Sequence, residues 1–198
     1  MLYWQTGSLN LADISRVLKD NSYEAPVLLT QVFLITGFGL KAAMIPFHAW
    51  LPDAHSSAPS PISSMLSGVL IKAVGIYALL RLFFNIFVLS YEIAVAITVL
   101  GAISMVIGVL LAIGQWDLKR LLAYHSISQM GYVIIGVGIG MIIIFRNGSE
   151  AVAGLAITGG LFHLINHAVF KGLLFLNAGA IEYMTGTRNL KRLGGLAK

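Results

Sequence analysis

The sequence predicts an all-α membrane protein with about five transmembrane helices, at least one of them discontinuous. Of its 198 residues, 58% are hydrophobic and 11% are charged, whereas about 25% of the residues of a soluble domain are charged. The apolar residues form continuous runs, which favour helices over a β-barrel. About 20 helical residues cross the roughly 30 Å of a bilayer's hydrocarbon. We therefore expect an extramembrane segment at 1–26, a helical membrane domain at 27–184 and a polar, basic tail at 185–198.

The first expected span, 27–50, runs into Pro46 and is followed by the polar stretch LPDAHSSAPSP. Irregular backbone at membrane depth survives only where protein buries it or where it lines a cavity. Discontinuous helices of this kind are typical of ion sites in transporters. The break around Pro46 and Pro52 is therefore a candidate functional feature.

The other expected spans cover 61–83, 92–114, 121–145 and 151–184. Ser60 is a candidate N-cap for the second, with Pro61 in the first helical position. The fourth contains Gly136-x-x-x-Gly140, a possible close-packing face. The fifth is longer than one crossing needs, so we expect it to be tilted or broken, with Gly159 and Gly160 as candidate break points.

Charge and cysteine content restrict the function. The net charge of +5 lies mostly in loops, which is typical of membrane orientation and not of nucleic-acid binding. Six basic residues are expected on the side of the C-terminal tail and four on the other, so the tail is predicted to be cytoplasmic and the chain to lie in the cell membrane. Without cysteine, disulfides, iron–sulfur clusters and thiolate metal sites are excluded.

Three lysines, Lys41, Lys72 and Lys171, lie inside apolar segments and not at their ends. A lysine near the bilayer centre costs at least about 2.5–3.5 kcal/mol, which marks it as a candidate for function. Burial disfavours the charged form and a nearby carboxylate favours it, so a lysine between these limits can take up and release a proton. The alternative is a structural lysine that donates to backbone carbonyls.

His163, His167 and Lys171 are spaced i, i+4, i+8, which places them on one helix face. Histidine shuttles protons near neutral pH, so a proton path is the first interpretation. A polar stripe that bonds to neighbouring helices is the second. A metal site is the third, although no HExxH motif, cysteine or nearby carboxylate would complete it.

Further polar residues are possible accessories. His48, Asp53 and His55 surround the predicted break, where an interfacial, capping or turn role is the alternative. His125, near the start of the fourth span, could join a path or face the interface. Uncharged polar residues in the last two spans could hold water chains or act as helix–helix contacts: Ser126, Ser128, Gln129, Asn166 and Asn177.

All eight acidic residues lie in expected tails, loops or helix ends, and none lies in the middle of a helix. Three buried lysines without a buried counter-charge look incomplete. We therefore expect a carboxylate to come from parts of the chain that are missing or from another subunit.

Three motifs carry a family resemblance. The run KAAMIPFHAWLPDAHSSAPSPISSMLSGVLIKAVGIYALLR resembles the signature of the antiporter-like membrane subunits of respiratory complex I, Mrp-type sodium/proton antiporters and membrane-bound hydrogenases. WDLKRLLAYHSISQMGYVIIG and HLINHAVFKGLLFLNAGAI are similar to the next two motifs of this family. The resemblance covers nearly the whole chain, and it implies the central part of an inverted-repeat antiporter-like fold.

The resemblance also implies roles for individual residues. Lys41 matches the lysine of the first broken helix, which faces a glutamate, and Lys72 matches the connecting lysine of the next helix. Lys119 would be less exposed than its position in a loop suggests. The residues that match the central polar axis of the family are Lys119, His163, His167 and Lys171.

Members of the family usually have about fourteen helices, so we expect the chain to be a short or split subunit or a fragment. The resemblance implies a non-redox subunit that translocates protons, with sodium as the alternative ion, in a complex I-like or hydrogenase complex. Its expected partners are other membrane subunits, one of which supplies the missing carboxylate helix, peripheral redox subunits and lipid. No cofactor, metal or nucleic acid is expected, and the redox chemistry lies elsewhere, so whether to class the chain as an enzyme stays open. The alternatives are a subunit of an Mrp-type antiporter and a truncated structural scaffold.

Overall fold

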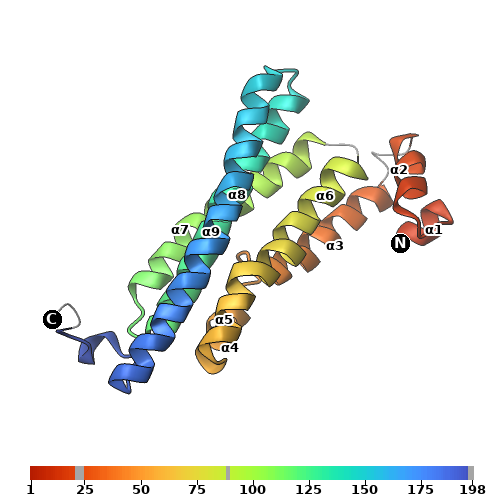
Figure 1. The fold of residues 1–198 in the computed structure, drawn as a ribbon. Coiled ribbons are helices and arrows are strands. Elements are labelled where there is room, and N and C mark those ends of the chain that lie inside the picture. The colour runs from red at the N-terminus through yellow and green to blue at the C-terminus, as the bar shows by residue number, and fades with distance from the viewer. Residues whose placement is uncertain (21–24, 88–89, 196–198) are drawn as a thin grey trace.

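The computed structural model describes residues 1–20, 25–87 and 90–195, with the side chains of Asp20, Lys72 and Ala73 outside this description. The described part is helical, as predicted, and five helical stretches are long and apolar enough to cross a membrane. They pack as a bundle, with two short helices at the N-terminal end (Figure 1). In chain order the elements are α1 Leu2–Thr6, α2 Leu11–Asp20, α3 Ala25–Ala42, α4 Trp50–Ser57, α5 Ser60–Met65, η1 Leu66–Tyr77, α6 Ala78–Asn85, α7 Tyr91–Ile113, α8 Leu118–Phe145, α9 Glu150–Thr185 and η2 Leu190–Arg192.

The first span is discontinuous, as predicted, and the break covers residues 43–49, which include Pro46, whereas Pro52 lies inside the next helix. α3 ends at Ala42, Ala43 takes a left-handed conformation with φ 54°, and α4 begins at Trp50. The Ile45–Pro46 peptide bond between them is cis. The prediction that Lys41 lies away from a helix end is therefore wrong, because Lys41 lies in the last turn of α3 with an exposed side chain.

The second span runs from Ser60 to Asn85 and changes its winding on the way. α5 is followed by η1, a π-helical stretch that contains Lys72, and α6 completes the crossing. A π-helical turn is rare and often marks a functional site. Ser60 is the first helical residue and not the cap, since Pro59 holds the N-cap position without a side-chain bond, so the predicted boundary is off by one residue.

α9 is one uninterrupted helix of 36 residues, so the predicted break at Gly159 or Gly160 is wrong. Gly160 has a different role. A Cβ there would lie 2.7 Å from the Val133 carbonyl oxygen, so the glycine lets α9 approach α8. Gly136 and Gly140 serve the same contact, since a Cβ on either would lie 3.0 Å from a carbonyl oxygen of α9, which confirms the predicted close-packing face.

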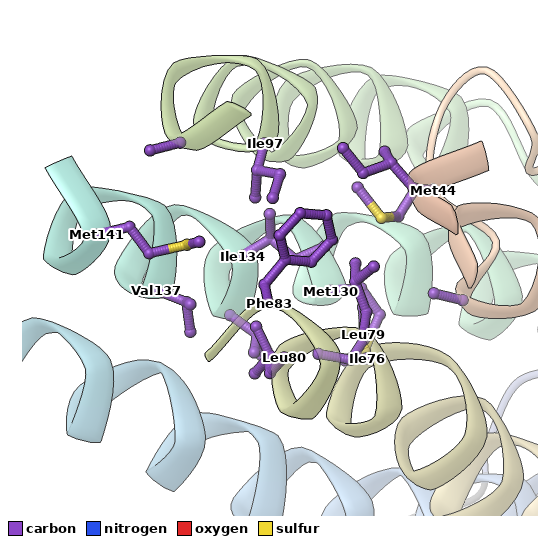
Figure 2. Close-up of a cluster of buried hydrophobic side chains, with 14 of the residues drawn as sticks. Met44, Ile76, Leu79, Leu80, Phe83, Ile97, Met130, Ile134, Val137 and Met141 are labelled. Atoms are coloured by element: carbon purple, nitrogen blue, oxygen red, sulfur yellow. The ribbon is translucent and has the colours of Figure 1, made fainter. Parts of the chain in front are cut away.

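The largest core cluster lies where α3, η1, α6, α7 and α8 meet. Figure 2 shows Phe83 from α6 pointing toward Ile97 of α7 and Ile134 of α8, with Met44 from the break at one end. This cluster joins the interrupted first span to the α7–α8 pair. The polar residues described next lie beside it and not within it.

Candidate functional site

Hydrogen bonds to α3 and α7 hold the break between α3 and α4 in place. The Met44 N–H donates to the Gly39 carbonyl oxygen at 2.8 Å, and Trp50 Nε1 donates to the Leu40 carbonyl oxygen at 2.9 Å. The Ile45 N–H donates to Ser104 Oγ of α7 at 3.1 Å, and Ser104 is fully buried. The first part of the break, residues 43–45, is thus buried in protein, as irregular backbone within a membrane protein requires, while Pro46 and Ala49 are exposed.

Replacing Ser104 by alanine is expected to destabilise the protein by about 1–3 kcal/mol, because the buried Ile45 N–H would lose its acceptor. Unfolding of the purified protein in detergent, followed by circular dichroism, measures this loss. Thr36→Val is the matched control, since the Thr36 hydroxyl donates only to the Val32 carbonyl oxygen of its own helix. Equal midpoints for the Ser104 and Thr36 variants would contradict the assignment.

Lys171 is fully buried on the face of α9 that packs against α8. Its Nζ donates to the Leu122 carbonyl oxygen of α8 at 2.7 Å and lies 5.9 Å from the centre of the Phe175 ring. The Ser126 hydroxyl also donates to the Leu122 carbonyl oxygen, at 3.1 Å. The Leu122 carbonyl oxygen therefore accepts hydrogen bonds both from Lys171 of α9 and from Ser126 of α8.

The predicted histidine stripe lies on the same face. His167 is fully buried, and the ring centres of His163 and His167 are 6.2 Å apart. His163 Nε2 forms a 2.8 Å hydrogen bond with Gln129 Oε1 of α8, and its ring lies 6.0 Å from that of Tyr132. Gln129 is thus brought to the path by its position on α8, one turn beyond Ser126.

Serine hydroxyls connect this stripe to the π-helical stretch. Ser67 Oγ of η1 lies 3.3 Å from Ser126 Oγ of α8, and both residues are buried. Ser126 in turn reaches the carbonyl that accepts from Lys171. Polar groups therefore run from η1 through α8 to α9. The predicted residue Lys72 lies in η1, but its side chain is outside the described residues.

The predicted accessory residues differ in how deeply they are buried. His55 is fully buried and stacks on Phe175 with ring centres 4.4 Å apart, while the ring of His48 lies 6.4 Å from that of Tyr124. Asp53 is mostly exposed and forms an ion pair with Arg120. His125 is half-buried, and its Nδ1 has no hydrogen-bond partner in the part of the chain that the structure describes.

Charged side chains form a network at one end of the bundle. This end consists of the α4–α5 turn, the start of α8 and the segment after α9, and we call it the C-terminal face. Lys119 is buried, and its Nζ donates to the Ala58 carbonyl oxygen at 3.0 Å and lies 3.5 Å from Glu182 Oε2. Arg188 Nε lies 3.6 Å from Glu182 Oε1 and 3.2 Å from Asp117 Oδ2.

Further hydrogen bonds, most of them to backbone atoms, hold the elements of the C-terminal face together. Arg188 Nη1 donates to the Ser56 carbonyl oxygen at 2.8 Å, and the Leu118 N–H donates to the Arg188 carbonyl oxygen at 3.1 Å. The Asp117 side chain caps α8 by accepting from the Arg120 N–H at 3.0 Å. Lys191 Nζ lies 4.3 Å over the Trp116 ring. The segment after α9 is thereby held against α4 and α8.

Sequence reasoning placed the candidate lysines and histidines but missed Glu182, Arg188 and the Leu122 carbonyl. Glu182 lies at a helix end, where a carboxylate is usually solvated, so its position alone does not single it out. Its pairing with Lys119 gives one of the candidate lysines a carboxylate from the same chain. Among the residues that the structure describes, no three histidine or acidic side chains gather where they could hold a metal ion.

Comparison with known proteins gives a consistent picture. The family described as NADH:quinone oxidoreductase/Mrp antiporter, TM, matches residues 1–198. The chain is 37% identical over its full length to NADH-quinone oxidoreductase subunit N of Desulforudis audaxviator and covers 37% of that protein. It is 40% identical to hydrogenase-4 component B of Escherichia coli, with 98% of the chain covering 29% of that protein.

A solved structure is also similar. A chain of the Mrp complex from Dietzia sp. DQ12-45-1b superposes on the whole chain with a TM-score of 0.83 at 32% identity, and the match covers 34% of that protein. The chain therefore spans about a third of the length of the proteins that it matches.

Proposed function

The chain belongs to the NADH:quinone oxidoreductase/Mrp antiporter family of transmembrane subunits, and from this premise we propose that it translocates protons. It acts as a non-redox membrane subunit of a respiratory complex of the complex I or membrane-bound hydrogenase type. The relatives named NADH-quinone oxidoreductase subunit N and hydrogenase-4 component B support this class of complex. The setting is the cytoplasmic membrane, with the C-terminal face toward the cytoplasm.

The observation that carries the proposal is the fully buried Lys171 in the middle of an apolar helix, aligned with His163 and His167. An ammonium in this position is costly, and a residue that is kept despite such a cost usually marks a functional site. The Leu122 carbonyl oxygen and Ser126 beside Lys171, and Gln129 beside His163, offer donors and acceptors to a proton that moves along the stripe. Protons pass between these groups when the charge of a neighbouring group changes, because each such change alters the cost of holding an ammonium there.

Partner chains complete the path. Lys41 lies exposed at the end of α3, next to the exposed apolar side chain of Leu40. No ion pair between Lys41 and a carboxylate is found within the ranges that the structure describes. A membrane helix that carries a carboxylate, from a longer form of the chain or from another subunit, would cover Lys41. Peripheral subunits would supply the redox energy.

A second function has a specific observation in its favour. The similar structure is part of an Mrp complex, and a relative from Alkalihalophilus pseudofirmus, 36% identical, is named as one of the subunits of a Na(+)/H(+) antiporter. In this reading the same polar path exchanges a cation for protons without electron transfer. The two functions differ in what drives proton movement, so they can be separated by experiment.

The test begins with native purification in mild detergent and identification of the co-purifying subunits by mass spectrometry. The whole complex is then placed in liposomes that contain a pH-sensitive dye. Proton movement that starts on addition of the electron donor of the co-purifying redox subunits supports the first function. Proton movement that starts on addition of sodium, without any electron donor, supports the second. A chain that purifies with partners but moves no protons in either assay is a scaffold, and the proposal is then wrong.

A further inference from the structure

One ion pair on the C-terminal face differs from the others in how its two partners are exposed. The Lys119 side chain is 3% exposed, whereas the side chain of its partner Glu182 is 39% exposed. In the Asp53–Arg120 pair both side chains are at least 36% exposed, and in the Asp117–Arg188 pair they are 28% and 27% exposed. Glu182 is therefore the carboxylate that solvent reaches and that also touches a buried amine.

The same carboxylate lies on the inward stripe of α9. Lys171, Phe175, Ala178 and Glu182 follow at intervals of four, three and four residues, which places them on one helix face. The first three are buried against α8. Glu182 thus continues the line of His163, His167 and Lys171 to the surface.

Only a short apolar stretch separates the surface pair from Lys171. Leu122, Phe175 and Ala178 form a buried cluster with Leu118 and Leu121 packed on it. On α8, Lys119 precedes Leu122 by three residues, a rise of about 4.5 Å, and the Leu122 carbonyl oxygen accepts from Lys171. The backbone of α8 therefore brings Lys119 within one turn of the residue that accepts from the deeper lysine, whereas Lys171 and Glu182 are eleven residues apart on α9, a rise of about 16 Å.

We propose that Glu182 is the residue through which protons enter or leave the lysine–histidine path at the C-terminal face, exchanging them between solvent and the buried Lys119. The inference rests on the proposed function and names its entry residue. Its physical basis is the position of one half-exposed carboxylate against a buried amine, in line with the deeper stripe.

The proton balance of one inward step is simple. The Glu182 carboxylate takes a proton from solvent and becomes a neutral acid. Lys119 gives the proton of its ammonium to Lys171 when Lys171 is a neutral amine, becomes an amine itself, and then takes the proton of the Glu182 acid. The ammonium and the carboxylate are thereby restored, and one proton has moved inward. The charged groups that face Glu182 are Lys119 of α8 and Arg188 of the segment after α9, with Asp117 beyond Arg188.

Arg188 fixes the position of the Glu182 carboxylate. Its guanidinium lies 3.6 Å from Glu182 and is itself held by Asp117 at 3.2 Å and by the Ser56 carbonyl at 2.8 Å. The Glu182 carboxylate is thereby kept within reach of Lys119 Nζ. A purely structural Glu182 would instead serve only to hold Arg188 in place.

The test compares Glu182→Gln with wild type in the whole complex reconstituted in liposomes, with proton movement measured from pH 6 to pH 9. Glutamine keeps the size and polarity but cannot carry a proton between solvent and Lys119. We expect the rate to fall by about tenfold to a hundredfold at the alkaline end, where protons are scarce, and by less at the acidic end. Glu182→Asp keeps the carboxylate and is expected to restore most of the rate and the wild-type pH profile.

Two references make the result decisive. Glu150→Gln removes an exposed carboxylate from the first turn of the same helix and is expected to behave as wild type. Lys171→Met tests the path itself. If Lys171→Met transports normally, the proposed function fails. If Lys171→Met abolishes transport while Glu182→Gln matches wild type at every pH, only the entry residue is wrong. A loss in Glu182→Gln that is the same at every pH assigns Glu182 a structural role and also overturns the inference.

Discussion

Replacing Lys171 by methionine is expected to lower proton movement by the reconstituted complex at least about tenfold while leaving its assembly intact. Methionine fills nearly the same space but carries no charge, so the path loses the ammonium that Leu122 now holds. The protein should become as stable as wild type or more stable, since burying a lysine costs at least about 2.5–3.5 kcal/mol. Loss of transport without loss of stability is the signature of a residue kept for function.

The measurement is dye-reported proton movement in liposomes, together with the thermal midpoint of the complex in detergent. Lys191→Met is the matched control, because it makes the same chemical change at an exposed lysine that packs over Trp116. Transport by Lys171→Met at more than half the wild-type rate would show that the stripe is structural.

Replacing Gly131 by alanine is expected to cost about 3 kcal/mol or more, through the contact between α7 and α8. A Cβ on Gly131 would lie 2.5 Å from the Gly101 carbonyl oxygen and 2.5 Å from the Met105 nitrogen, both backbone atoms of α7. Backbone cannot move aside as a side chain can, so the two helices must separate and lose their packing. The break at residues 43–49 should loosen as well, because Ser104 of α7 holds Ile45.

Unfolding by sodium dodecyl sulfate, titrated against mild detergent and followed by circular dichroism, measures this effect. Gly159→Ala is the control, since a Cβ there meets no atom within 4 Å and alanine favours a helix by about 1 kcal/mol. The Gly159 variant should match wild type or exceed it. A Gly131 variant that unfolds with the control would disprove the close contact.

The sequence predicted the class of fold and the number of spans because the cost of exposing charge and backbone in lipid leaves few options. It also predicted the shared face of His163, His167 and Lys171, which depends only on helical spacing. It could not predict where a helix is interrupted or continuous, or where it becomes π-helical. Gly159 and Gly160 suggested a weak point in a long helix, but Gly160 is explained by contact with α8, and α9 stays unbroken.

The contacts that complete the candidate site have no signature in the sequence. The acceptor of Lys171 is a backbone oxygen, and any residue at position 122 would provide one. Glu182 meets Lys119 only because α8 and α9 are antiparallel and the segment after α9 folds back over the start of α8 (Figure 1). Asp53 is the reverse case, since its place in a conspicuous motif suggested a part in the path, yet the structure gives it an exposed ion pair with Arg120.

The 36-residue helix α9 is also longer than the hydrocarbon layer of a bilayer is thick. At about 1.5 Å per residue the helix is about 54 Å long, and at a tilt of 40° it still covers about 41 Å against about 30 Å of hydrocarbon. With the helix centred in the bilayer, Glu182, three residues from its end, would lie among the lipid headgroups. Anionic headgroups at about −30 mV enrich protons at the surface about threefold. Vesicles of anionic rather than neutral lipid should therefore move the pH profile of wild-type transport by about half a unit toward alkaline pH.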